Sequence, residues 1–109
     1  MNYKIIASDG FKRDLKPLNK KYRSLKSDLS DLFDSLEVNP QQGDEPGKSC
    51  YKVRLAIKSK GKGKRGGARV ITYVITENEE IILLSIYDKK EKDTLLPNEL
   101  DDLLSEINI

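Results

Sequence analysis

The residues of this chain best suited to chemistry are cations gathered in one segment. Between positions 48 and 69 the sequence has nine lysines and arginines and no acidic residue. The net charge of the whole chain is only +2, so the remainder carries −7. A cluster of this kind binds a phosphate backbone by releasing its counterions, whereas scattered cations would do little. The segment therefore favours nucleic acid as a partner over the alternative, a solvated loop that keeps the protein soluble.

Lys52 and Arg54 alternate with apolar residues within the segment 50–57. This alternation predicts a strand with cations on one face and apolar side chains on the other. Cleavage of RNA needs a base for the 2′-hydroxyl, a donor for the negative phosphate and an acid for the 5′-oxygen. Arginine suits the second task, and a lysine whose pKa is lowered by a neighbouring cation suits proton transfer. Two interpretations stay open: an RNA-cleaving face, or a surface that binds a polyanion or an acidic protein without chemistry.

Other kinds of site find little support in the composition. The chain has no histidine, the usual general base near neutral pH and the commonest metal ligand. Cys50 is the single cysteine, which rules out an internal disulfide or a cysteine-based zinc site. Asp88, Glu91 and Asp93 stand among lysines, which is typical of a solvated turn rather than a metal site. We therefore expect no metal and no cofactor.

The chain also lacks the marks of export or membrane insertion. No apolar run approaches the ~20 residues that a membrane-spanning helix needs. Residues 1–9 are short, mixed in character and followed by charged residues, unlike a signal peptide. We therefore expect a soluble, cytoplasmic protein with no membrane partner.

The apolar patterning predicts the elements that must position the cations. At 109 residues we expect one domain, 1–109. Apolar and β-branched runs predict strands at 3–7, 50–57, 68–76 and 81–87. Three- and four-residue spacing predicts helices at 19–38 and 97–107, and Asp9 and Pro17 bound a short helix at about 11–15. We expect a loop at 39–49 and a mobile, glycine-rich hairpin loop at 58–67.

This order predicts an α+β fold with a small, mainly antiparallel four-stranded sheet, two N-terminal helices and a C-terminal helix. We expect the helices on one side of the sheet. The other face would then be free, and it would carry Lys52, Arg54 and, depending on the strand register, Arg69.

The element order and the segment CYKVRLAIKSKGKGKRGGARVITYVI resemble the RelE/ParE superfamily of toxins from bacterial type II toxin–antitoxin modules, and its RelE-like branch most. The resemblance runs nearly end to end and includes LLSIYDKKEKDTL near the end of the chain. It implies a compact RelE-like fold of the microbial-ribonuclease type and ribosome-dependent cleavage of mRNA in the A site by metal-independent 2′-hydroxyl attack. It also implies two partners, a cognate antitoxin and the 70S ribosome with its mRNA.

The resemblance also implies roles for individual residues. Lys52 and Arg54 take the place of cations that contact the scissile phosphate and assist proton transfer. Arg69 takes the place of a strand arginine that stabilises the transition-state charge. Lys90 takes the place of a basic residue, usually arginine, that supports departure of the leaving group. Several relatives have a tyrosine further on, where this chain reads DTLL, so Tyr87 is the substitute if its ring turns toward the phosphate.

The glycine- and lysine-rich loop is expected to contact the backbone of rRNA or mRNA through Lys58, Lys60, Lys62, Lys64 and Arg65. ParE-like members of the superfamily inhibit DNA gyrase and cleave no RNA. A non-catalytic toxin, or a binding module that acts on gyrase or another partner, is therefore the alternative. For regulation we expect an antitoxin segment that covers the basic face or displaces the C-terminal helix.

Overall fold

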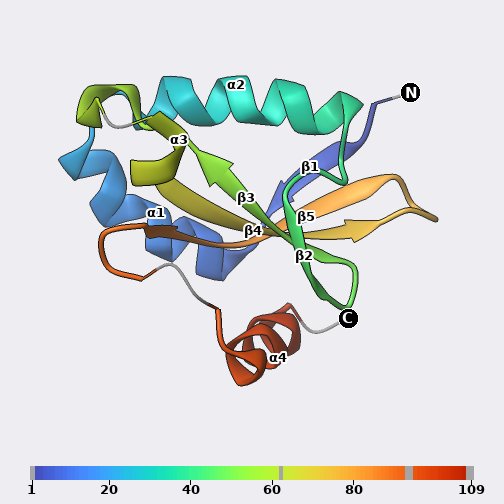
Figure 1. Cartoon of the computed structure of the whole chain (residues 1–109). Coiled ribbons are helices and arrows are strands. Elements are labelled where there is room, and N and C mark those ends of the chain that lie inside the picture. The colour runs from blue at the N-terminus through green and yellow to red at the C-terminus, as the bar shows by residue number, and fades with distance from the viewer. Residues whose placement is uncertain (1, 62, 93–94, 108–109) are drawn as a thin grey trace.

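The computed structural model describes residues 2–61, 63–92 and 95–107 of the chain. Figure 1 shows one central sheet with helices on both sides of it. The elements in chain order are β1 (Lys4–Ala7), α1 (Asp9–Lys21), α2 (Leu25–Val38), β2 (Asp44–Gly47), β3 (Cys50–Leu55), the 3₁₀ turn η1 (Lys58–Lys60), α3 (Gly63–Gly66), β4 (Ala68–Ile75), β5 (Glu80–Asp88) and α4 (Pro97–Glu106). No helix in the described part of the chain is long and apolar enough to cross a membrane.

The sheet has the strand order β1-β5-β4-β3-β2. β1 pairs parallel with β5, and the other neighbours are antiparallel, so β3, β4 and β5 form a meander at its centre. The predicted α+β fold is confirmed, with five strands instead of four. The added strand is β2, which falls inside the expected loop at 39–49, where two prolines and two glycines mask a strand of only four residues.

The two N-terminal helices divide differently from the prediction. α1 runs through Pro17 to Lys21, and its N-cap is Ser8, whose Oγ accepts from the backbone N–H of Phe11 at 3.1 Å. α2 then begins only at Leu25. A proline inside a helix costs about 3 kcal/mol. Burial of Phe11 and Leu18 from both sides of Pro17 against the sheet offsets that cost, a gain that local patterning does not show.

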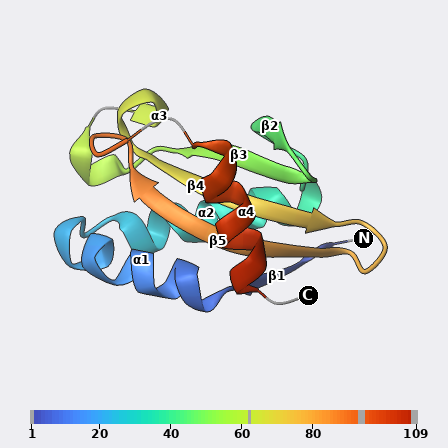
Figure 2. The same ribbon diagram turned by 90° about the horizontal axis from the view of Figure 1, so that it is seen from below.

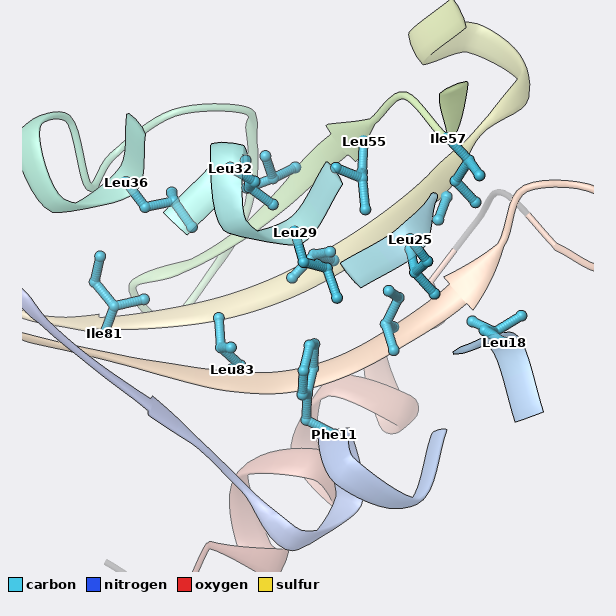
Figure 3. Close-up of a cluster of buried hydrophobic side chains, with 14 of the residues drawn as sticks. Phe11, Leu18, Leu25, Leu29, Leu32, Leu36, Leu55, Ile57, Ile81 and Leu83 are labelled. Carbon is cyan, nitrogen blue, oxygen red and sulfur yellow. The ribbon is translucent and has the colours of Figure 1, made fainter. Parts of the chain in front are cut away.

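The larger core lies between α1, α2 and one face of the sheet, which we call the α2 face. Leu25, Leu29, Leu32 and Leu36 form one stripe of α2, as their spacing predicts. Figure 3 shows this stripe over the strands, with Phe11 and Leu18 of α1 alongside. The strands contribute Val53, Leu55, Val70, Val74, Ile81, Leu83 and Ile86; the wider spacing from Leu83 to Ile86 coincides with an irregularity in the β4–β5 register.

The C-terminal helix packs on the opposite face, which we call the α4 face (Figure 2). The expectation that all helices share one side, and that the other face is free, is therefore wrong. Leu100 of α4 is buried with Cys50, Ile71, Leu84 and Tyr87 of the strands. Ion pairs also join α4 to the rest of the molecule: Lys48 with Asp101, Arg13 with Glu106 and Lys92 with Glu99. The apolar stripe of α4 predicts burial, but it does not say against which face.

The segment at 58–67 is more structured than the expected hairpin loop. The segment begins with η1, which is held in place by Asp28 of α2 and by Ser24, the N-cap residue of that helix. The backbone N–H of Lys58 donates to Asp28 Oδ2 at 3.1 Å, and that of Ser59 donates to Ser24 Oγ at 2.9 Å. Ser24 Oγ itself donates to Asp28 Oδ2 at 2.7 Å. Asp28 is buried, so its carboxylate serves as an internal anchor for the start of this loop.

Gly67, at the end of the same loop, lies against the backbone of β3. A Cβ at this position would lie 1.9 Å from the Leu55 carbonyl oxygen, so Gly67→Ala must force the two segments apart. We expect it to lower the free energy of unfolding by about 2–3 kcal/mol. Gly10→Ala is the matched control, because its Cβ would meet nothing closer than 3.5 Å in the first turn of α1. Urea denaturation should show the control unchanged or up to about 1 kcal/mol more stable.

Candidate nucleic-acid interface and catalytic site

The strand register brings three of the predicted catalytic residues into one row. Arg54 of β3 lies opposite Arg69 of β4, and Arg69 lies opposite Tyr87 of β5. All three are on the α4 face, because Tyr87 packs in the cluster with Leu100 and directly opposed residues share a face. With strands ≈ 4.8 Å apart, the row spans about 10 Å of backbone. Lys52 stands two residues before Arg54 on the same face.

Lys52 and Arg54 lie where a large anion can approach. Arg54 is exposed and Lys52 is half-buried. Together with Gln42 and Asp44 they line a surface hollow of about 340 Å³ at the edge of the sheet. Asp44 lies opposite Lys52 in the β2–β3 register, so a carboxylate shares this hollow with the two cations. The predicted alternation of β3 is confirmed, and it leaves a cationic edge beside α4.

Arg69 is placed differently from the expectation of an exposed residue. Only 2% of it is exposed. One guanidinium nitrogen donates to the Ala68 carbonyl at 3.0 Å, and another donates to the Arg65 carbonyl of α3 at 3.3 Å. These bonds satisfy backbone acceptors at the start of β4 and in α3. Arg69 therefore sits at the centre of the row but beneath its surface, and it ties the preceding loop to the sheet.

Tyr87 and Lys90 line a second, larger groove of about 760 Å³ between α1 and the segment after β5. Its charged lining residues are the cations Arg13, Lys21, Lys90 and Lys92 and the acids Asp14 and Glu91. Lys90 is exposed, whereas Tyr87 is only 8% exposed. Lys92 Nζ stands 4.8 Å from the centre of the Tyr87 ring, which is within the range of a cation–π contact.

The structure thus separates the predicted residues into two groups. Lys52 and Arg54 line the hollow at the β3 edge, and Tyr87 and Lys90 line the groove at the β5 edge. Arg69 lies buried between the two groups. Arg54 and Tyr87, one from each group, share the α4 face, on which α4 also packs.

The loop cations also divide into two kinds. Lys58 is exposed, 3.5 Å from the exposed Asp31, and Arg65 is exposed in α3. Lys60 is turned inward, with only 8% of its side chain exposed, so the expectation that it contacts an RNA backbone is not met by its position. Lys62 and the side chain of Lys64 lie outside the described residues.

A buried cluster surrounds Asp88, where the sequence predicts a solvated carboxylate. Asp88 is fully buried at the end of β5. Its Oδ1 accepts from Lys60 Nζ at 2.8 Å and from the backbone N–H of Lys90 at 3.0 Å. Its Oδ2 accepts from the Tyr22 hydroxyl at 2.5 Å. The only sequence signal is a single acidic residue directly after a continuous apolar strand, and it does not identify either partner.

The surroundings of Asp88 hold it in its charged form. Burial by itself raises the pKa of Asp88, but hydrogen bonds from Lys60, Tyr22 and the backbone of Lys90 outweigh it and lower the pKa to about 2. The hydrogen bond to Asp88 is also the main reason that the pKa of Tyr22 is raised above its ordinary value. Lys60 Nζ lies 5.3 Å from the centre of the Tyr22 ring, which adds a cation–π contact.

Asp88 should therefore make the stability of the protein depend on pH in acid. Its folded pKa, about 2, is below the unfolded value of about 3.9, so its contribution is complete above pH 4 and is lost as the pH falls toward 2. We expect this contribution to be about 2 kcal/mol. The free energy of unfolding, measured by urea denaturation at several pH values, should fall more steeply between pH 5 and pH 2 for the wild type than for Asp88→Asn. Asp34→Asn, at an exposed site on α2, controls for the loss of one carboxylate; equal slopes for wild type and Asp88→Asn would contradict the prediction.

Cys50 is buried under α4, and its burial raises the pKa of the thiol to about 11. A thiol of this kind is protonated at neutral pH and a poor nucleophile.

Comparison with known proteins gives the fold a name. No protein-family model matches the sequence. A mutant of the Escherichia coli toxin RelE in the free state has 20% sequence identity and a TM-score of 0.59, over 97% of this chain and 94% of that one. The Mycobacterium tuberculosis toxin–antitoxin complex RelBE2 has 17% identity and a TM-score of 0.59, over 81% and 92%. The intact E. coli RelBE complex has 18% identity and a TM-score of 0.51, over 79% and 95%. The chain therefore has the fold of the RelE toxins.

Proposed function

We propose that this protein is the toxin of a type II toxin–antitoxin module and that it cleaves mRNA in the ribosomal A site. The observation that carries the proposal is the row of Arg54, Arg69 and Tyr87 across three strands of a RelE fold, with Lys52 beside it. A basic row on a sheet face is by itself a binding surface. The RelE fold supports the further step to an endoribonuclease, because the row is made of residues to which the resemblance assigns roles in cleavage.

The chemistry needs no group beyond the chain and its substrate. A base removes the proton of the 2′-hydroxyl, the oxygen attacks the adjacent phosphorus, and the bond to the 5′-oxygen breaks as that oxygen takes up a proton. Lys52 and Arg54 contact the phosphate and assist these proton transfers. Lys90, from the groove side, stabilises the leaving oxygen. As a lysine it supplies a point charge and lacks the two-pronged contact of arginine.

Arg69 acts in this scheme from below the row. Its planar guanidinium fits the oxygens of a pentavalent phosphate. To reach them it exchanges the hydrogen bond to the Arg65 carbonyl for one to the substrate. RNA binding is thereby coupled to a small movement of α3, the short helix of the loop.

The experiment that tests the proposal is primer extension on a translating mRNA. Purified protein is added with ribosomes, without ribosomes, and as Lys52→Ala. Cuts that are confined to the A-site codon, need ribosomes and fade with the substitution support the proposal. Growth inhibition in cells without any cleavage by the wild type would refute the nuclease and favour the non-catalytic, ParE-like alternative. The burial of Arg69 is the specific observation that keeps this alternative in view.

The cognate antitoxin is the proposed partner of the free protein. It covers the cationic edge at Lys52 and Arg54 or displaces α4, which charged pairs and a small apolar cluster hold in place. The purified toxin–antitoxin complex should cleave ribosome-bound mRNA far more slowly than the free toxin. Equal rates would refute this mode of inhibition and leave the nuclease itself untouched.

A further inference from the structure

A buried ion pair joins two segments that both border the candidate site. Lys60 Nζ lies 2.8 Å from Asp88 Oδ1, and the exposed fractions of the two side chains are 8% and 0%. The Tyr22 hydroxyl bonds the second oxygen of Asp88, and Lys60 Nζ also lies 3.4 Å from the Gly67 carbonyl. One carboxylate thus binds the C-terminal end of α1, the turn η1 and the end of β5 to one another.

The same aspartate fixes the segment that carries the groove cations. Its Oδ1 accepts from the backbone N–H of Lys90, while its carbonyl oxygen accepts from Glu91 at 2.9 Å and Lys92 at 3.3 Å. The Gly67 carbonyl accepts from the N–H of Lys89 at 3.1 Å. The chain after β5 is therefore folded around Asp88, and the position of Lys90 depends on that side chain.

The other side of the ion pair reaches Arg69. η1, which contains Lys60, is held to α2 through the backbone bonds of Lys58 and Ser59. The loop then passes through α3, whose Arg65 carbonyl accepts from the Arg69 guanidinium at 3.3 Å. The Lys60–Asp88 pair thus joins the loop that contacts Arg69 to the segment that carries Lys90.

Stability alone does not account for this arrangement. A buried ion pair gains little over well-packed apolar side chains, because both charges must be stripped of water. Separation of the pair, however, leaves an uncompensated charge inside the protein, which disfavours any arrangement that moves the two segments apart. An RNA contact is also a poor account of Lys60, because its ammonium group lies inside the protein with two oxygen acceptors.

We propose that Lys60, Asp88 and Tyr22 form a positioning unit, in which Lys60 sets the location of Lys90 and of the loop whose Arg65 carbonyl accepts from Arg69. This inference rests on the proposed nuclease function. Lys60 is thus a positioning residue, distinct from the exposed lysine two places before it, Lys58, although both belong to the same basic loop. A displacement of about 1 Å in a catalytic group can slow a reaction by about 100-fold.

The test compares Lys60→Met with Lys58→Met, which remove the same charge from the same turn. Single-turnover cleavage is measured at increasing ribosome concentration, at a temperature where every variant is more than 99% folded. Lys60→Met should lower the saturated rate constant by about 10–100-fold and leave the apparent affinity within about twofold. Lys58→Met should weaken the affinity for ribosomes and flatten its salt dependence. Lys26→Met, exposed on α2, serves as the control without effect.

Equal losses of affinity in the Lys60 and Lys58 variants, with the wild-type rate at saturation, would overturn the proposal and return Lys60 to the RNA-binding set. A merely structural role would lower the melting temperature of Lys60→Met without changing the saturated rate, and that result would overturn it as well.

A second measurement does not depend on nuclease activity. Amide hydrogen exchange of Lys90, whose N–H bonds Asp88, should speed up at least 10-fold in Lys60→Met and stay at the wild-type rate in Lys26→Met. If the wild type cleaves no RNA, the proposed function fails, and this exchange still reports whether the unit holds Lys90. An unchanged exchange rate would overturn the positioning role on its own.

Discussion

Replacing Arg54 with alanine is expected to slow cleavage of ribosome-bound mRNA by about 100- to 1,000-fold, the effect of removing one well-placed donor from a developing negative charge. Arg54 is the exposed arginine of the cross-strand row, so its loss should remove phosphate contacts while leaving the core intact. Single-turnover rates at saturating ribosomes measure the effect on the chemical step. The free energy of unfolding should change by less than about 0.5 kcal/mol.

Arg23→Ala is the matched control for Arg54→Ala, because Arg23 is also exposed but lies in the connection between α1 and α2. It removes the same charge and should leave the rate at saturation close to that of the wild type. If the two variants lose activity equally, the effect of Arg54 is one of net charge, and its place at the scissile phosphate is refuted.

Replacing Asp88 with alanine is expected to cost about 3–5 kcal/mol of folding stability. The substitution leaves the ammonium group of Lys60 inside the protein without its counter-ion, and it removes the acceptor for Tyr22 and for the backbone of Lys90. Urea denaturation at neutral pH, followed by circular dichroism, measures the loss. A change of this size is a large part of the stability of a small domain.

Two further variants show where that energy resides. Tyr22→Phe removes one hydrogen bond to the same carboxylate and should cost about 1.5–3 kcal/mol. Asp102→Ala, at an exposed position of α4, should change the stability by less than about 0.5 kcal/mol. If Asp88→Ala behaved like Asp102→Ala, the carboxylate would have to be solvated in solution, and the positioning unit would have no basis.

Much of the fold could be predicted because apolar periodicity reports burial directly. The alternation around Lys52 and Arg54 identified β3 and its cationic face, and the apolar run before Asp88 identified β5. Two features depend on tertiary packing, which local patterning does not report. α1 continues through Pro17 because side chains on both sides of that proline are buried. α4 packs on the second face because Cys50, Leu84 and Tyr87 form an apolar patch there.

The candidate site was predictable only as far as it follows strand register. Arg54, Arg69 and Tyr87 share a row because the spacing of β3, β4 and β5 requires it. The depth of a side chain is a different matter. Arg69 and Lys60 look like ordinary members of a basic segment, yet the structure buries both beside oxygen acceptors. Such acceptors come from distant parts of the chain, and no short-range pattern identifies them.

The pairing of β1 with β5 has a consequence for the order of assembly. The Ser8 hydroxyl donates to the carbonyl of Leu84, 76 positions further along the chain, and β1 pairs with residues 80–83. The apolar stripes of α1 and α2 are likewise buried by strands that are translated after them. Contacts this far apart in sequence form slowly and late. During synthesis, the apolar faces of about the first 40 residues therefore stay exposed until the later strands are made. The sheet that carries the basic row can form completely only after β5 has emerged from the ribosome.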